Sequence, residues 1–297
     1  MGPDHRSRPG RRRDRAAALT GPGRGVRHGG TVGGVTDASA AELLTGAVGD
    51  LVADLRRLRA PALADEPDAV HQLRTTVRRL RNLLAGFRRY LHRKPADELR
   101  ARLASYGALL GEGRDLEVRA DDCRRVLAEL DRGDLLDDLV APLLAGHAAE
   151  HARLVAWHAT DEAAALDAVL DSWAARPPLR RKRAAGSARS AGRRVVRHEA
   201  GRVLDRADAA GETSHDVRKA ARRLRHVAEV AGDDRAAQLG KDIQSCLGDH
   251  RDAVLLAGYL WSAGAPAVLV AHVEVLAGRA LADLPDALRR LRALNES

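Results

Sequence analysis

Residues 71–81 read HQLRTTVRRLR, and residues 215–225 read HDVRKAARRLR. Each segment has a histidine followed by arginines three, seven and ten residues later. These residues are His71, Arg74, Arg78 and Arg81 in the first copy, and His215, Arg218, Arg222 and Arg225 in the second. At about 100° per residue the four positions fall within about 80° of arc, so a helix places them on one face. Such crowded cations repel one another, and they predict a negatively charged ligand or partner.

A second stripe on the same two segments is apolar. It comprises Leu73, Val77, Leu80 and Leu84 in the first segment, and Val217, Ala221, Leu224 and Ala228 in the second. This stripe lies roughly opposite the basic one, which predicts two amphipathic helices with a core side and an accessible basic side. A third match to the basic spacing begins at His5, but Arg11 and Asp14 occupy its apolar positions, so we interpret it as accidental.

A second motif follows each basic segment. Residues 110–115 read LGEGRD and residues 247–252 read LGDHRD, so both copies contain Leu-Gly-x-x-Arg-Asp. Two ordered motifs repeated about 140 residues apart indicate an internal duplication. We therefore predict a first helical repeat over residues 37–176 and a second over residues 177–297.

The composition favours an all-α protein. The chain has 297 residues, of which only 2% are aromatic, and long stretches rich in Ala, Leu and Arg contain few alternating β-branched runs. No apolar run approaches 18 residues, so no membrane span is expected, and the Arg-rich start lacks the apolar region of a secretory signal. We expect a cytoplasmic protein, in which the isolated Cys123 and Cys246 are ordinary helix residues.

The net charge of +9 is concentrated near the N-terminus. Residues 1–36 carry eight arginines and two aspartates, and they are rich in Gly and Pro without a hydrophobic period, which predicts a disordered tail. The tail is either an arm that attracts nucleic acid or translated upstream sequence, with the native start near Val35. The rest of the chain is nearly balanced, so local clustering of charge decides its chemistry.

Capping residues, glycines and prolines predict the helices. We expect the third helix to be interrupted or kinked near Gly111 and Gly113, and the last helix to break at Pro285. The predicted helices span residues 36–60, 65–92, 95–130, 134–158, 161–175, 179–207 and 233–263. A further helix begins at residue 215, after a cap at residues 211–214, and the last one begins at residue 266. The 179–207 helix is very basic. Short connections favour antiparallel neighbours, and we predict two bundles of about four helices each, facing each other with a pseudo-two-fold relation.

The pattern H-x-x-R-x-x-x-R-R-x-R followed by L-G-x-x-R-D, present twice in a helical chain, resembles the CHAD family (conserved histidine α-helical domain). The second half is especially similar, from His215 through the segment LGKDIQSCLG at 239–248. The resemblance covers about residues 37–297. It implies binding of inorganic polyphosphate by both helical halves and association with polyphosphate granules. The E-x-E-x-K motif of the hydrolase domain that precedes some members is absent, so the resemblance implies a stand-alone, non-catalytic module.

The resemblance also transfers a set of binding residues. Besides the two histidines and six arginines of the basic stripes, they are Arg79, Arg114, Arg193, Arg197, Lys219, Arg223, Lys241 and Arg251. The halves differ, because Thr75 stands where the second copy has Lys219, and His226 replaces a Tyr-like residue. We expect Asp115 and Asp252 to hold neighbouring arginines.

These residue types suit a polyphosphate chain. Arginine presents a planar fork that binds phosphate oxygens in pairs, and it stays charged at working pH. Positions three to four residues apart are about 5 Å apart along a helix, so one stripe follows several phosphates. A histidine at a helix start adds the positive end of the helix dipole. The anion should raise the histidine pKa, making part of the affinity pH-dependent, and binding should weaken with salt.

Other interpretations remain open from the residues alone. The arginine stripes could form structural ion pairs with the facing bundle, or could bind nucleic acid, for which the scarcity of aromatic residues is unfavourable. A phosphate-processing enzyme is disfavoured, because no carboxylate cluster for Mg²⁺ stands out. The pair His147 and His151, with Glu150, lacks a third metal ligand, and we expect no metal and no cofactor. Trp157, Trp173 and Trp261 are expected to fill the core.

Overall fold

A computed structural model describes residues 38–209 and 214–296 of the chain, and these residues are helical without a β-strand. The expected all-α class is confirmed. The predicted disordered tail and the cap at residues 211–213 lie outside the described residues. The α-helices are α1 (Ala40–Leu63), α2 (Ala69–Gly86), α3 (Arg93–Glu129), α4 (Leu136–Leu139), α5 (Ala141–His158), α6 (Asp161–Ala175), α7 (Arg181–Ala184), α8 (Ala188–Asp208), α9 (Ser214–Ala231), α10 (Asp234–Ser262), α11 (Ala267–Ala280) and α12 (Leu284–Glu296).

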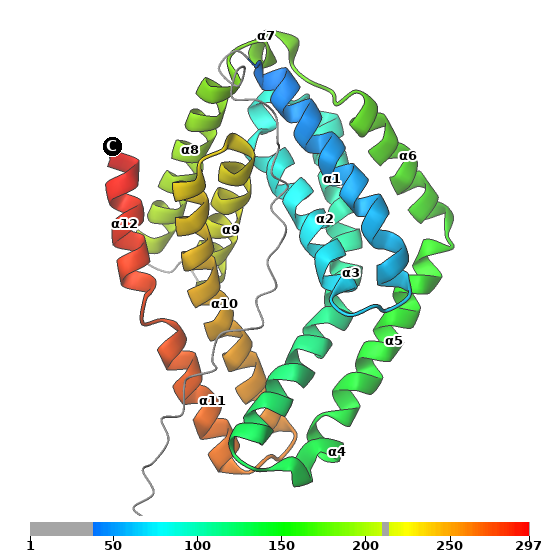
Figure 1. The fold of residues 1–297 in the computed structure, drawn as a ribbon, viewed down its shortest axis with the longest axis vertical. Helices are drawn as coiled ribbons and strands as arrows, with labels where there is room; N and C mark the ends of the chain where they lie inside the picture. The colour runs from blue at the N-terminus through cyan, green and yellow to red at the C-terminus, as the bar shows by residue number, and fades with distance from the viewer. Residues whose placement is uncertain (1–37, 210–213, 297) are drawn as a thin grey trace, which may run out of the picture. The chain divides into compact units, whose positions relative to one another are not determined.

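The two basic segments form α2 and α9, and these helices lie beside each other in the middle of the domain (Figure 1). α2 packs between α1 and α3, and α9 packs between α8 and α10. The predicted apolar stripes enter one core, where Leu73 and Leu80 of α2 and Leu224 of α9 are at most 1% exposed. The amphipathic assignment from the sequence is therefore confirmed for both helices.

The halves of the chain meet a second time at the far ends of α3 and α10. A separate apolar cluster joins Leu127 of α3 and Leu143 of α5 to Leu260 of α10 and Val273 of α11. The convergence of these helices is visible at the lower end of Figure 1. Contacts at both places fix the separation and angle of the helices that carry the basic stripes.

Several predicted helix limits are wrong. The α1 helix does not end before Pro61 but includes it, because a proline in the last turn removes only one helical hydrogen bond. The predicted 134–158 helix is divided into two helices, α4 and α5, and Pro142 lies in the first turn of α5. The predicted 179–207 helix is divided into α7 and α8 around Gly186, whose carbonyl accepts a 2.8 Å hydrogen bond from the backbone of Ala40.

The expected interruption near Gly111 and Gly113 is also absent, since α3 runs unbroken through both residues. These glycines are buried because side chains lie directly against them. A Cβ on Gly111 would be 3.0 Å from the guanidinium of Arg74, and one on Gly113 would be 3.4 Å from Glu150. Glycine at these positions makes room for neighbouring helices and does not end α3.

Candidate polyanion-binding site

Four arginines from the two basic helices form one cluster. Burial, together with the charges of Arg74 and Arg218, lowers the pKa of Arg78 to about 10. Burial lowers the pKa of Arg222 to about 9, with added repulsion from Arg78 and Arg218. Burial and the charges of the neighbouring arginines thus both lower the pKa of Arg78, Arg218 and Arg222. We call Arg74, Arg78, Arg218 and Arg222 the arginine cluster.

Little negative charge compensates this cluster. Arg74 donates a 2.6 Å hydrogen bond to Asp115, as expected for that aspartate. Arg78 reaches only the Thr75 hydroxyl, at 3.2 Å, and within the described ranges Arg218 and Arg222 have no ion-pair partner. The buried Nε atoms of Arg78, Arg218 and Arg222 have no hydrogen-bond partner. Buried charged donors without acceptors cost several kcal/mol, so the cluster is suited to receive an anion.

The repeated Leu-Gly-x-x-Arg-Asp motif supports these arginines from α3 and α10. The Arg74 guanidinium lies over Gly111 of α3, and the Arg218 guanidinium lies over Gly248 of α10, where a Cβ would be 3.4 Å away. Burial lowers the pKa of Arg218, and the charge of Asp252 opposes that shift, while Asp115 forms an ion pair with Arg74. The motif therefore places a glycine beneath one arginine of each stripe and an aspartate near it.

The arginine of the same motif contacts the histidine of each stripe. The Arg114 Nε–H donates to Nδ1 of His71 at 3.2 Å, and Arg251 Nη1 lies 3.4 Å from Nδ1 of His215. Burial, together with nearby cations, lowers the pKa of both histidines. Both are in the first turn of their helices, and without a ligand the neutral imidazole is favoured. The described part of both halves has the same arrangement. The histidine of the stripe contacts the arginine of the Leu-Gly-x-x-Arg-Asp motif, and the first arginine of the stripe lies over the glycine of that motif.

Asn82 and His226 join α2 to α9, and each is the eleventh residue after the histidine of its own stripe. Asn82 Nδ2 lies 2.8 Å from His226 Nδ1, and His226 is only 4% exposed. Burial, followed by the charges of Arg79 and Arg225, lowers the pKa of His226 well below its ordinary value. The residue that departs from the family pattern therefore fills the contact between the two basic helices as a neutral side chain.

This pair predicts that the fold loses stability in acid. Because the unfolded chain protonates His226 near its ordinary pKa and the folded chain does not, stability is present above that pKa and falls as pH decreases through it. Between about pH 7.5 and 5.5, we expect a loss of about 1.4 kcal/mol from this residue. Urea unfolding measured across this range should show a weaker pH dependence in His226→Gln. Equal pH dependence in both proteins would contradict the assignment.

Several predicted binding residues also lie in ion pairs. Arg79 and Arg225 both contact Glu229, at 3.6 and 2.8 Å. Arg223 points toward α8, where it lies 3.8 Å from the buried carboxylate of Glu199. Lys219 lies 3.8 Å from Asp216, and Arg114 also contacts Glu117 at 2.9 Å. Ion pairs of the kind that the structural alternative requires are thus present in this outer set, while none is found for Arg78, Arg218 or Arg222 among the described residues.

Three other predicted binding residues are exposed: Arg193, Arg197 and Lys241. Their charges are not among the main causes that lower the pKa of Arg78 and Arg222. Arg100 is not among the predicted residues, yet its charge adds to the burial that lowers the pKa of Arg81 and that of Arg223. The sequence does contain an indication that Arg100 lies near the basic stripes. It is eleven residues before Gly111, and this spacing places both residues on the same face of α3.

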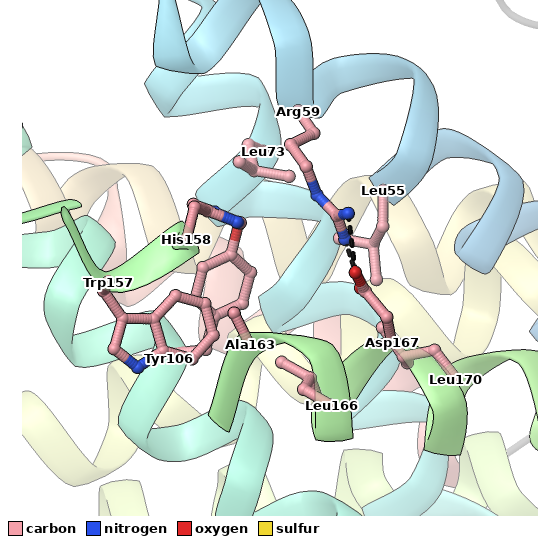
Figure 2. Close-up of a pocket in the computed structure, with 10 residues that line it drawn as sticks. All are labelled: Leu55, Arg59, Leu73, Tyr106, Trp157, His158, Ala163, Leu166, Asp167 and Leu170. Carbon is pink, nitrogen blue, oxygen red and sulfur yellow. Dashed lines mark hydrogen bonds and ion pairs between the residues drawn. The ribbon is translucent and has the colours of Figure 1, made fainter. Parts of the chain in front are cut away.

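A small pocket elsewhere is closed by its own side chains (Figure 2). Its volume is about 10 Å³, enough for roughly one water molecule. Tyr106 Oη lies 3.0 Å from His158 Nε2, and Arg59 donates to Asp167 at 2.7 Å. Trp157 stacks on Tyr106 with ring centroids 4.9 Å apart. This pocket joins α1, α3, α5 and α6, and it offers no space for a larger ligand.

Two further expectations concern tryptophans and metals. Trp173 is buried as expected, but Trp261 is 77% exposed, so its assignment to the core is wrong. His147 Nδ1 lies 3.1 Å from the Gly113 carbonyl, and its Nε2 lies 3.2 Å from Asp65. Over the described ranges no group of three or more His, Cys, Asp or Glu side chains could hold a metal ion, and no helix there is long and apolar enough to cross a bilayer.

The chain belongs to the CHAD domain family, which residues 46–261 match. It is 32% identical over 217 residues to an uncharacterized protein from two strains of Mycobacterium tuberculosis, covering 65% of this chain and 40% of that protein. The chain thus spans about two fifths of the length of these relatives. Its fold is similar to the CHAD domain of the plant Ricinus communis, with a TM-score of 0.65, 25% identity, and coverage of 87% and 93%. It is also similar to PptA from Streptomyces chartreusis, with a TM-score of 0.67, 19% identity, and coverage of 88% and 100%.

Proposed function

We propose that this domain binds inorganic polyphosphate at the arginine cluster, without catalysis, and associates with polyphosphate granules. The observation that carries the proposal is that Arg78, Arg218 and Arg222 combine a buried Nε atom without a hydrogen-bond partner with the lack of any ion-pair partner among the described residues. Phosphate oxygens supply both the missing acceptors and the missing negative charge. Membership in the CHAD family supports the same ligand, because the family resemblance implies polyphosphate binding.

The cluster offers charge and hydrogen-bond donors but no surface for stacking bases. In the described part of the chain, the arginine–aromatic contacts are those of Arg89 with Tyr90 and of Arg119 with Tyr259, and none involves the cluster. Proteins that bind single-stranded nucleic acid commonly stack bases on aromatic rings. A linear polyphosphate has no bases, so two arginine-rich helix faces are sufficient to recognise it.

A non-catalytic role agrees with the carboxylates around the cluster. Asp115 is held by Arg74, and Glu229 is held by Arg225. An enzyme that hydrolyses phosphoanhydrides needs a base or a metal to activate water. These carboxylates are occupied as partners of arginines, and we therefore propose binding and not hydrolysis.

A competition titration tests this function. We expect long-chain polyphosphate to displace labelled single-stranded RNA and DNA from the domain. Its log affinity should decrease linearly with log salt, because binding releases counterions. Preferential binding of nucleic acid at equal total charge would replace polyphosphate with nucleic acid as the ligand. Release of phosphate in the presence of Mg²⁺ would contradict the non-catalytic role.

A further inference from the structure

A second basic surface lies where α7 meets the segment between α2 and α3. The backbone N–H of His92 donates to the Pro178 carbonyl at 2.9 Å, and the N–H of Arg180 donates to the Tyr90 carbonyl at 2.8 Å. Residues 89–94 therefore run beside residues 178–183, at the end of the domain where Figure 1 labels α7. Two segments far apart in the sequence thus bring their side chains to one surface.

Six exposed cations define this surface, which we call the end patch. They are Arg89, Arg93, Lys94, Arg181, Lys182 and Arg183. Counting only described residues, none of the six has an ion-pair partner. Asp97, the nearest acid in the sequence, is already occupied, because it accepts hydrogen bonds from Arg88 at 3.0 Å and from Arg100 at 3.2 Å.

The surrounding sequence does not neutralise the end patch. Residues 172–198 contain nine arginines and lysines and no aspartate or glutamate, in a chain whose total net charge is +9. A surface with a local excess of cations over acids attracts polyanions over a distance of about 10 Å at moderate salt. Such a local excess distinguishes the end patch from arginines of the domain that lie beside a carboxylate, such as Arg57 beside Asp54.

The end patch lacks the features that would select a membrane or a base. No large, exposed apolar residue of the described chain falls within residues 86–94 or 176–198. The nearby ring of Tyr90 is 5% exposed, with the Arg89 guanidinium 5.9 Å from its centroid. Membrane-surface helices require apolar side chains to insert, and base recognition requires rings or base-edge contacts. Charge and guanidinium donors remain, which match the chemistry of the arginine cluster.

We propose that the end patch is a second contact for polyphosphate, which holds a distant segment of a long chain whose other segment occupies the arginine cluster. This inference rests on the proposed function of the cluster. A second contact on the same polymer acts at a high effective concentration, so it strengthens the binding of long chains and not that of short ones. The domain would then select polyphosphate by length.

The test compares two variants of equal charge. The patch variant is R93Q/R181Q/K182Q/R183Q, which changes exposed side chains without ion-pair partners in the described structure. The control variant is R57Q/R124Q/R125Q/R289Q, whose arginines are exposed and are each paired with an aspartate three residues earlier. Affinities for long-chain polyphosphate and for tripolyphosphate are measured for the wild type, both variants and R78Q/R222Q, after circular dichroism has established that each is folded.

We expect the patch variant to lose at least about tenfold in affinity for long-chain polyphosphate and to bind tripolyphosphate like the wild type. The control variant should change by less than about twofold for both ligands. Equal losses of long-chain binding in the patch and control variants would overturn the end patch. If R78Q/R222Q bound both ligands like the wild type while the patch variant lost long-chain binding, the cluster function would fail and the patch would remain.

Discussion

Replacing Arg78 and Arg222 with glutamine should nearly abolish polyphosphate binding and, at the same time, raise the thermal stability of the free domain. These arginines have the most strongly lowered pKa values in the cluster, about 10 and about 9. Hydrogen bonds to charged groups contribute about 1.5–3 kcal/mol each, so the loss of two guanidiniums should weaken binding by about 100-fold or more. Titration calorimetry and thermal melting of R78Q/R222Q measure both effects.

The increase in stability separates a binding role from a structural one. If these arginines held the fold together, their removal would lower the melting temperature. Because their buried Nε atoms are unpartnered and their charges repel, removal should raise it by roughly 2–4 °C in the absence of ligand. Adding polyphosphate should then raise the melting temperature of the wild type more than that of the variant. A lower melting temperature and undiminished binding in R78Q/R222Q would contradict the proposal.

Replacing Gly240 with alanine should produce the largest loss of stability among single small substitutions in α10. A Cβ at this position would lie 2.8 Å from the backbone nitrogen of Arg225 and 2.9 Å from the carbonyl oxygen of Ala221. Both atoms belong to the backbone of α9, which cannot move aside as a flexible side chain can. Separating the two helices should cost about 1–3 kcal/mol or more in the free energy of unfolding, measured with urea.

The same substitution should also reduce binding, because α9 carries half of the arginine cluster. Gly258 in the same helix provides a matched control, since a Cβ there would have no atom within 4 Å. Alanine at that exposed position should stabilise α10 by about 0.5–1 kcal/mol through its higher helix propensity. Equal stability of Gly240→Ala and Gly258→Ala would show that the close approach of α9 and α10 is not required.

The Leu-Gly-x-x-Arg-Asp motif illustrates how far sequence reasoning extends. The sequence shows its repetition but predicts, in the first copy alone, an interruption or kink of the third helix near Gly111 and Gly113. The structure shows the opposite role, with Gly111 and Gly248 leaving space for the guanidiniums of Arg74 and Arg218. A glycine that ends a helix and one that accepts a neighbouring side chain look alike in sequence, because only the packing partner distinguishes them.

Spacing within one helix determined a great deal by itself. Periodicity of 3.6 residues placed the tetrads beginning at His71 and His215 on basic faces and their apolar companions in the core, since both follow from local geometry. Only the tertiary structure decided which cations lack a counter-charge. Arg223 lies beside Glu199 and Arg225 beside Glu229, whereas Arg222 has no such neighbour within the described ranges. The reason is physical: an ion pair requires two groups to meet in space, and helix packing brings carboxylates to some arginines and other arginines to the rest.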